Sequence, residues 1–170
     1  MKISKILSFS VIILLISLAS CSGSGKKATY KIEKASFNLE APLFSGANST
    51  QAEHKLDLAA IKKELGIEGG EVKSAKLTKA VIYFQDSAST DLANSVVMSL
   101  AGDKVNMAQM AVANPLEAGK KEVILKSSSE AEIAEFFNQT MMYIVLDVDL
   151  KNDSESTLKL SADLEFELEF

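Results

Sequence analysis

The sequence predicts an all-β protein with two short helices, built as an antiparallel β-sandwich of the immunoglobulin-like or jelly-roll kind. The first observation is the C-terminal stretch, residues 157–170, in which polar and apolar residues alternate strictly. The second is a similar alternation over residues 142–150, and the third is a series of other β-rich segments separated by turn residues. A period of two is typical of a strand that buries one face and exposes the other. About eight such strands in one domain favour a sandwich, with a small closed β-barrel as the alternative.

The two C-terminal strands carry the clearest pattern. Their apolar positions are Met142, Ile144, Leu146, Val148 and Leu150, followed by Leu158, Leu160, Ala162, Leu164, Phe166, Leu168 and Phe170. Asn152, Asp153 and Ser154, which lie between the two runs, are turn-forming residues. We therefore predict that the two strands pair with each other as a long antiparallel hairpin.

The other predicted strands are shorter or less regular. Apolar residues alternate from Tyr30 to Leu39, but they change parity near Glu33 and Lys34, which predicts a β-bulge there. A short strand is expected over His54, Leu56 and Leu58. Further strands are expected over residues 72–85, over 96–100 and 105–107 as a hairpin, and over 123–125.

Two helices are predicted from capping patterns. Asp57 can cap the first, which Gly66 would end, and Ser129 with Glu132 forms a capping-box pattern for the second. Their apolar residues are Leu58, Ile61 and Leu65 in the first helix, and Ile133, Phe136 and Phe137 in the second. The segment from Asp91 to Leu100 fits either a helix or a strand.

The N-terminus has the layout of an export signal. Lys2 and Lys5 give it a positive start, and residues 6–18 are almost wholly apolar or hydroxylated. This stretch is shorter than the roughly 18–20 residues that a membrane-spanning helix needs. Small residues follow it, and Cys21 comes directly after them. A basic start, a short apolar centre and a small-residue end are typical of a cleaved signal peptide.

The tetrapeptide Leu18-Ala19-Ser20-Cys21 resembles the lipobox of bacterial lipoproteins. The resemblance covers only the first 21 residues. It implies that the Cys21 thiol receives a diacylglycerol and that a peptidase cuts just before this residue. Ser22 in the next position is similar to the choice made by lipoproteins of the outer membrane. Lys26 and Lys27 replace the acidic residues that send some lipoproteins to the cell surface, so the side of the membrane stays open.

The chain is thus predicted to have three parts: a signal peptide over 1–20, a lipidated cysteine with a flexible Gly/Ser tether over 21–27, and a sandwich domain over 28–170. Cys21 is the only cysteine, so no disulfide can form within the chain. Lipidation explains this unpaired thiol in an exported protein. Two or more fatty chains hold a protein stably on a membrane, whereas one does so only marginally.

Composition limits the possible partners. Removing the signal takes away two lysines and no acidic residue, so the formal charge falls from −5 to −7. An acidic domain repels phosphate backbones, and we therefore expect no nucleic-acid partner. Every basic residue is Lys, which lacks the bidentate fork of Arg. The chain has no Trp and only three Tyr, and this weakens a carbohydrate-binding interpretation.

No catalytic motif is visible. A Ser–His–Asp or Cys–His arrangement would have to use His54, the only histidine, and we interpret His54 as a surface or rim residue. No G-x-S-x-G elbow is present, and Cys21 is assigned to the lipid. A zinc site of histidines and cysteines is excluded by the same counts. We expect no enzymatic activity and no cofactor.

Carboxylates and methionines are the remaining candidates. Asp147, Asp149 and Asp153 are weak candidates for calcium ligands, near Asn152 and Glu155. An EF-hand is excluded because Lys151 and Asn152 stand where that loop needs an oxygen ligand and a glycine. The acidic stripe of Asp163, Glu165, Glu167 and Glu169 is interpreted as a solvated face that discourages edge-to-edge aggregation. The methionines, Met98, Met107, Met110, Met141 and Met142, are interpreted as core filler rather than as an adaptable binding surface.

Three functions remain open, in order of preference. The first is a non-enzymatic lipoprotein that binds a protein or envelope component or serves as an assembly subunit. The second is a carrier of a small hydrophobic ligand, which needs a cavity lined by Met and Phe. The third is a hydrolase with two carboxylates facing each other in a cleft. The expected location is the outer membrane of the cell envelope, on its periplasmic face or at the cell surface.

Overall fold

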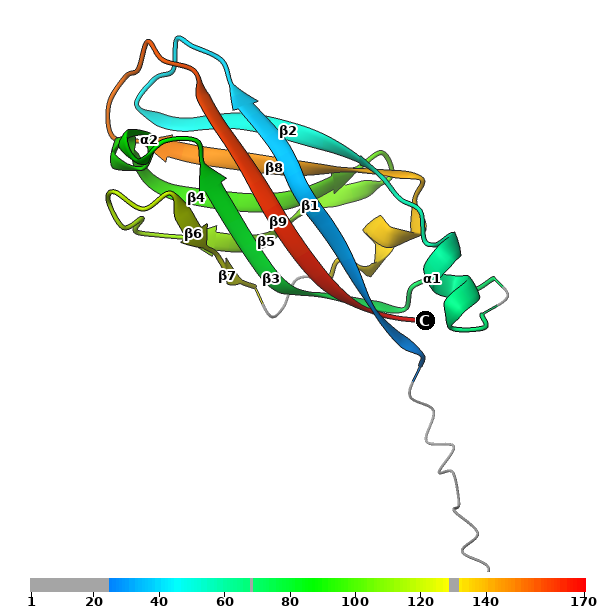
Figure 1. Ribbon diagram of the computed structural model, residues 1–170. Helices are drawn as coiled ribbons and strands as arrows, with labels where there is room; N and C mark the ends of the chain where they lie inside the picture. The colour runs from blue at the N-terminus through cyan, green and yellow to red at the C-terminus, as the bar shows by residue number, and fades with distance from the viewer. Residues whose placement is uncertain (1–24, 68, 129–131) are drawn as a thin grey trace, which may run out of the picture.

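The computed structural model describes residues 25–67, 69–128 and 132–170, which form two facing antiparallel sheets (Figure 1). The strands are β1 (Lys27–Leu39), β2 (Gly46–Lys55), β3 (Ser74–Phe84), β4 (Ala93–Gly102), β5 (Val105–Ala113), β6 (Glu122–Ile124), β7 (Lys126–Ser127), β8 (Met141–Leu150) and β9 (Leu158–Glu169). The helices are α1 (Ala59–Glu64), α2 (Ser87–Leu92) and the 3-10 helix η1 (Ala134–Asn138). The predicted β-sandwich with short helices is therefore confirmed, and the sheets stay open rather than closing into the alternative barrel.

The strand order is that of a jelly roll. One sheet has the order β1-β9-β3-β6, and the other has the order β2-β8-β4-β5-β7. Apart from the short β7, the pairs are nested: β4 pairs with β5, β3 with β6, β2 with β8 and β1 with β9. This arrangement results when the whole chain forms one long antiparallel hairpin that is then rolled up. Successive strand pairs of the hairpin then alternate between the two sheets.

The predicted hairpin between the last two strands is wrong. β8 pairs with β2 and β4, whereas β9 pairs with β1 and β3 in the opposite sheet. Residues 151–157 carry the chain from one sheet to the other, where Leu43 forms an isolated bridge with Ser154. Each strand has a period-two pattern because it faces the same core, and this pattern does not specify a partner strand.

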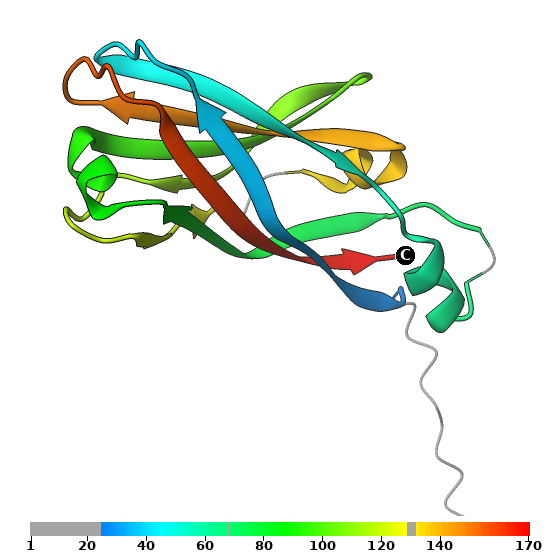
Figure 2. The same cartoon turned by 45° about the horizontal axis from the view of Figure 1, so that its top comes forward.

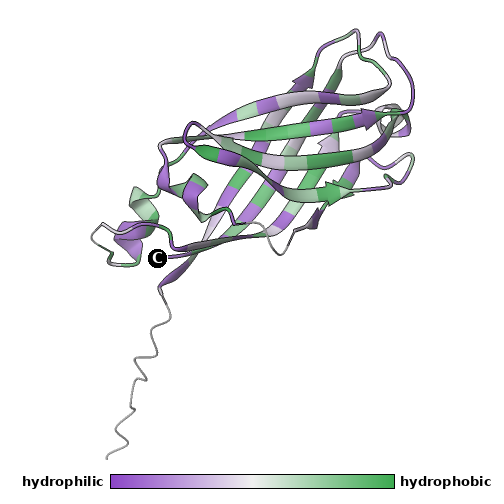
Figure 3. Cartoon of the chain, turned by 180° about the vertical axis from the view of Figure 1, so that it is seen from behind, coloured by the Kyte–Doolittle hydropathy of each residue, from purple (hydrophilic) through white to green (hydrophobic). Residues whose placement is uncertain are grey.

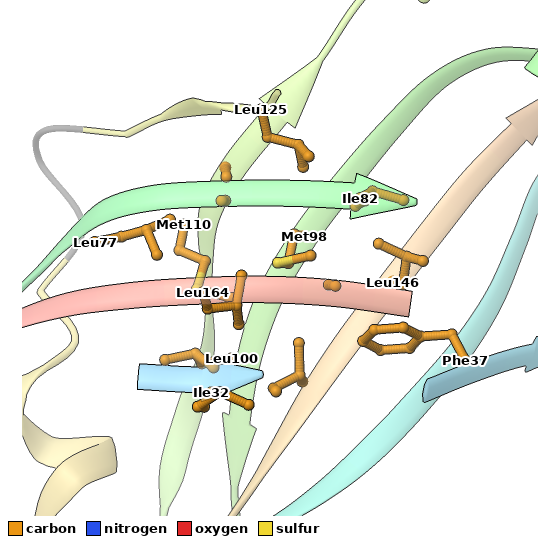
Figure 4. Close-up of a cluster of buried hydrophobic side chains, with 14 of the residues drawn as sticks. Ile32, Phe37, Leu77, Ile82, Met98, Leu100, Met110, Leu125, Leu146 and Leu164 are labelled. Atoms are coloured by element: carbon orange, nitrogen blue, oxygen red, sulfur yellow. The ribbon is translucent and has the colours of Figure 1, made fainter. Parts of the chain in front are cut away.

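The core lies between the sheets, and the predicted inward residues of β8 and β9 are all buried. Figure 3 shows the alternating hydrophobic and hydrophilic bands along the strands that produce this core. Side chains of one sheet, such as Ile32, Leu77 and Leu164, meet Leu100 and Leu146 of the other (Figure 4). Fully burying one such side chain contributes roughly 1.5–3 kcal/mol, so this interlayer holds the sheets together.

The strand β1 contains the predicted bulge. Its pairing with β9 shifts register between Ile32 and Ala35, and Lys34 has a φ of 54°. The backbone N–H of Lys34 donates to Asp163 Oδ1 at 2.8 Å instead of joining the ladder. The bulge therefore keeps Ile32 and Phe37 facing the core although their parities differ.

The strand β2 was predicted only at its end. It runs from Gly46 to Lys55, so His54 lies within it, but Leu56 and Leu58 lie beyond it. It is an edge strand of its sheet, and its inward residues are only half-buried. An edge strand of this kind needs few large apolar residues, which explains why its sequence gave little signal.

The helix α1 ends at the glycine that was predicted to end it, but its N-cap is Leu58 rather than Asp57, and Leu58 makes no side-chain capping hydrogen bond. Asp57 Oδ1 accepts the N–H of Ala59 at 3.0 Å, and Gly66 ends the helix with a φ of 61°. Phe136 and Phe137 lie buried in the short η1, while Ser129 of the predicted capping box lies outside the described residues. The ambiguous Asp91–Leu100 segment divides between α2, which was not predicted, and β4.

The two ends of the domain lie together beside α1 (Figure 1). Gly25 N donates to Glu169 Oε1 at 3.0 Å, and Lys26 O accepts from Phe170 N at 2.9 Å. Gly25 and Lys26, which were assigned to the tether, thus contact the end of the sandwich through these hydrogen bonds. Within the described ranges, no helix is both long and apolar enough to cross a membrane.

The acidic stripe lies in the middle of its sheet, so its interpretation as edge protection is wrong. Its strand, β9, is flanked by β1 and β3, and lysines of both neighbours stand opposite the acidic residues. Lys27 Nζ contacts Glu167 at 2.9 Å, and Lys31 Nζ contacts Glu165 at 3.1 Å. The hydrogen bond and charge of each partner raise the pKa of Lys27 and lower that of Glu167. The stripe is the centre of a neutralised charge ladder on the outer face.

Candidate functional site

β1 and β2 are edge strands of the two sheets and lie side by side (Figure 2). Residues of both strands line a surface groove. We call it the edge groove. Its volume is about 510 Å³, within the range of small ligand sites. The residues that line it are Lys31, Ile32, Glu33, Lys34, Ala35 and Ser36 of β1, Gln51, Ala52, Glu53 and His54 of β2, and Ile144 of β8.

The shape of the groove follows from small residues and from the bulge. Ala35 and Ala52 point inward from the two edge strands, and they leave the buried Ile32 and Ile144 as an apolar floor. The bulge at Glu33 turns the rim of β1 away from the regular ladder. The groove thus has an apolar floor and a polar rim, the usual combination in a binding site.

Two hydrogen bonds link the sheets on either side of the groove. The Tyr30 hydroxyl lies 2.8 Å from His54 Nε2, and their rings meet edge-to-face with centroids 5.8 Å apart. Beyond the groove along the same strands, Thr50 Oγ1 donates to Asn38 O at 3.0 Å. Tyr30 also packs edge-to-face on Phe137, which packs on Phe166 in the core. These contacts fix the separation of β1 and β2 at both ends of the groove.

Partial burial shifts the pKa of both His54 and Tyr30. Burial lowers the pKa of His54, because the half-buried site disfavours the charged imidazolium. Burial also raises the pKa of the Tyr30 hydroxyl, against a smaller opposing effect of a hydrogen bond with the Asp57 backbone. Both groups are therefore held in their neutral forms at neutral pH, and the pair is a structural link without charge.

We expect His54→Gln to reduce the pH dependence of stability in mildly acidic solution. Because the pKa of His54 is lower in the folded state, the unfolded state binds more protons below its ordinary value near 6.5. Stability should therefore fall as the pH drops from 6.5 toward the folded pKa. Urea unfolding at a series of pH values should show a shallower slope for the variant. An identical slope for both proteins in this window would contradict the assignment.

The edge groove lacks the arrangement of a hydrolytic site. In a Ser–His–Asp triad a serine hydroxyl contacts the histidine, whereas here the Tyr30 phenol occupies His54 Nε2. Glu33 and Glu53 bring one carboxylate to each side of the groove, as a two-carboxylate hydrolase would require. Both are exposed residues of an open rim, and catalytic pairs work in sites that exclude water. The geometry fits binding better than hydrolysis.

The calcium candidates do not meet at one point. Asp147 accepts a hydrogen bond from Ser49 on the outer face of β8, and Asp149 accepts from Asn94 Nδ2 at 3.0 Å. Asp153 lies in the β8–β9 loop, where its Oδ1 accepts the Ser45 N–H at 2.7 Å. Within the described chain, no group of three or more His, Cys, Asp or Glu side chains is placed to hold a metal ion. Cys21 lies outside the described residues.

The methionines and phenylalanines that a carrier would need mostly fill the core. Met98, Met110 and Met142 are fully buried, whereas Met107 is exposed on the outer face of β5. This packed core counts against a ligand cavity between the sheets. A larger groove of about 700 Å³ lies beside the start of β3 and is lined by Lys73, Lys76, Ser128, Glu132 and Glu135 among others, so it is not lined by methionine or phenylalanine.

Sequence reasoning identified His54 but missed the rest of the site. Tyr30, Ala35 and Ala52 belong to it because two strands from different sheets lie side by side. The change of parity near Glu33 was the only signal of the site in the sequence. Nothing in the polar sequence of β2 indicates that it faces β1.

Comparison with known proteins gives no family. No family model matches the chain, and no curated protein matches it. A solved structure of carbohydrate-binding modules from the beta-sandwich superfamily is 8% identical, with a TM-score of 0.34. That match covers 80% of this chain, which spans about 55% of the other protein. A structure of Desmodium yellow mottle tymovirus is 11% identical over 85% of this chain and 87% of that chain, with a TM-score of 0.30. Neither likeness is close enough to transfer a function.

Proposed function

We propose that this protein is a lipid-anchored, non-enzymatic binding module of the bacterial cell envelope, tethered to the outer membrane through Cys21. The lipobox-like Leu18-Ala19-Ser20-Cys21 carries the anchoring part of the proposal. The first described residue, Gly25, is hydrogen-bonded at one end of the sandwich. The four residues that follow Cys21, up to and including Gly25, can span at most about 14 Å. The anchor would therefore hold this end of the sandwich close to the lipid surface.

The binding part of the proposal depends on the edge groove. It combines an apolar floor with a polar rim that includes Lys34, Glu33 and Glu53, and Lys31 at this rim is paired with Glu165. The apolar floor suits an apolar group of the ligand. The loop between β1 and β2, which contains the exposed Phe44, lies at the opposite end of the sandwich from the C-terminus (Figure 1). This loop would therefore point away from the membrane.

Mass analysis of the protein purified from membranes tests the anchoring part directly. The expected product lacks residues 1–20 and carries a diacylglyceryl group on Cys21, with or without an additional acyl chain on its amine. In phase separation with a nonionic detergent, the protein should enter the detergent-rich phase. A mature protein that keeps residues 1–20, or that has an unmodified Cys21, would contradict the proposal.

A further inference from the structure

The four edges of the two sheets are protected to different degrees. Exposed strand edges invite pairing with another chain, and proteins block them with bulges, lysines, prolines or very short strands. The edge strands β6 and β7 span only three and two residues. The edge of β1 is broken by its bulge and carries Lys27, Lys31 and Lys34. The edge of β1 therefore resists the addition of a strand, whereas β6 and β7 cover only residues 81–83 of β3 and 111–112 of β5.

The edge of β2 has none of these protections. Its register with β8 continues without a shift from Gly46 to Lys55. It contains no proline, and residues 46–52 carry no charge. It is thus a long regular edge of polar and small residues, and no strand of the described part of the chain pairs with it on the side away from β8. Backbone groups on such an edge can form ladder hydrogen bonds with any extended segment.

The edge groove lies where the side chains of an added strand would point. A strand paired with β2 would run about 4.8 Å from it, and every second side chain would face the opposite sheet. Ala52 and Ala35 leave room there above the apolar Ile32 and Ile144. Edge hydrogen bonds with pockets for alternate side chains are the usual means by which a sheet binds a peptide.

We infer that β2 binds an extended peptide segment of another envelope protein by strand addition, with an uncharged apolar side chain seated in the edge groove. The apolar floor formed by Ile32 and Ile144 favours an apolar side chain at this position. This inference names the ligand of the proposed binding module. Its location in the envelope rests on the proposed anchor.

A second copy of the chain fits this edge less well on an anchored protein. Antiparallel pairing of two β2 strands would reverse the second copy and place its residue 25 at the opposite end of the sandwich. A ten-residue strand is roughly 33 Å long. The four residues that follow Cys21 reach at most about 14 Å, so both copies could not be anchored in one membrane.

The test uses the protein produced without residues 1–20 and with a biotin-acceptor tag ahead of Cys21, to select binders from a phage-displayed library of random dodecapeptides. We expect enrichment of sequences with an apolar residue flanked by residues of high β-propensity. Ala52→Lys, which places a lysine on the inward side of the edge, should weaken an enriched peptide about tenfold or more. Ala47→Lys is the matched control, because it adds the same charge to the exposed outer face of β2.

Two further measurements would test the same interpretation. Ala35→Leu is a second variant that can be used if Ala52→Lys does not fold. It fills the groove from β1 with an apolar side chain, and it should therefore also weaken binding of the peptide. Hydrogen exchange should show added protection of backbone amides in residues 46–55 when the peptide is bound.

Several outcomes would overturn the inference: no enriched peptide, equal binding by both lysine variants, or no protection in β2. Sedimentation that shows a dimer lost in Ala52→Lys would instead identify a second copy as the occupant. The amino-end biotin does not depend on the lipid. An unmodified Cys21 would therefore refute the proposed anchor without deciding the peptide result.

Discussion

Cys21→Ser is expected to release the protein from the membrane almost completely. The variant has no thiol to accept a diacylglycerol, and each buried CH₂ of a fatty chain contributes about 0.8 kcal/mol to membrane binding. After cell fractionation, the processed variant should be found in the soluble envelope fraction instead of the membrane pellet. Any variant that is not processed should be found as a precursor that still carries residues 1–20.

The control for this experiment is Ser24→Ala, which changes the expected tether but keeps the thiol. It should fractionate with the membranes as the unaltered protein does. If Cys21→Ser matures normally and stays in the pellet at the level of the control, the proposed anchor is incorrect.

Phe166→Ala is expected to cause the largest loss of stability among single substitutions in the sandwich. Phe166 is fully buried on β9, a central strand, and its ring meets Phe137 edge-to-face at 5.0 Å. Truncating a buried phenylalanine costs about 3–5 kcal/mol, because apolar surface is lost and a cavity remains. Native domains of ordinary size are stable by only about 5–15 kcal/mol. Urea denaturation followed by circular dichroism should therefore show a much lower midpoint or an unfolded protein.

Glu167→Ala on the next residue of the same strand is the matched control. Glu167 points to the exposed face, where it pairs with Lys27. Exposed ion pairs contribute little because water and salt screen them, so this change should shift the midpoint much less. Similar midpoints for the two variants would mean that Phe166 is not part of a tightly packed core.

The local features of the fold could be predicted because neighbouring residues determine them. The alternation in β8 and β9 predicts which of their residues are buried, since successive side chains of a strand face opposite ways. The parity change at Glu33 and Lys34 predicts the bulge, and Gly66 predicts the end of α1. The short turn at Asp103 and Lys104 joins β4 and β5 as the hairpin that was expected.

The candidate site could not be predicted in the same way. The edge groove exists because β1 and β2 lie on the same side of two different sheets, and Ala35 and Ala52 there leave space. Small residues in a polar strand have no periodic signal, and Tyr30 gives no indication that it contacts His54. Only the hydrogen bond between them shows that the sole histidine is a link between the sheets.

The sequence alone determined the all-β class and the inward faces of the strands that supply most of the core, while the export signal with its lipobox-like motif stays a prediction. Tertiary structure alone decided that β8 and β9 lie in different sheets, that the acidic stripe is central, and that β2 is an open edge beside a groove. The physical reason is that alternation reports burial on one face of a strand. Strand partners are chosen instead by packing and hydrogen bonding between residues far apart in the chain.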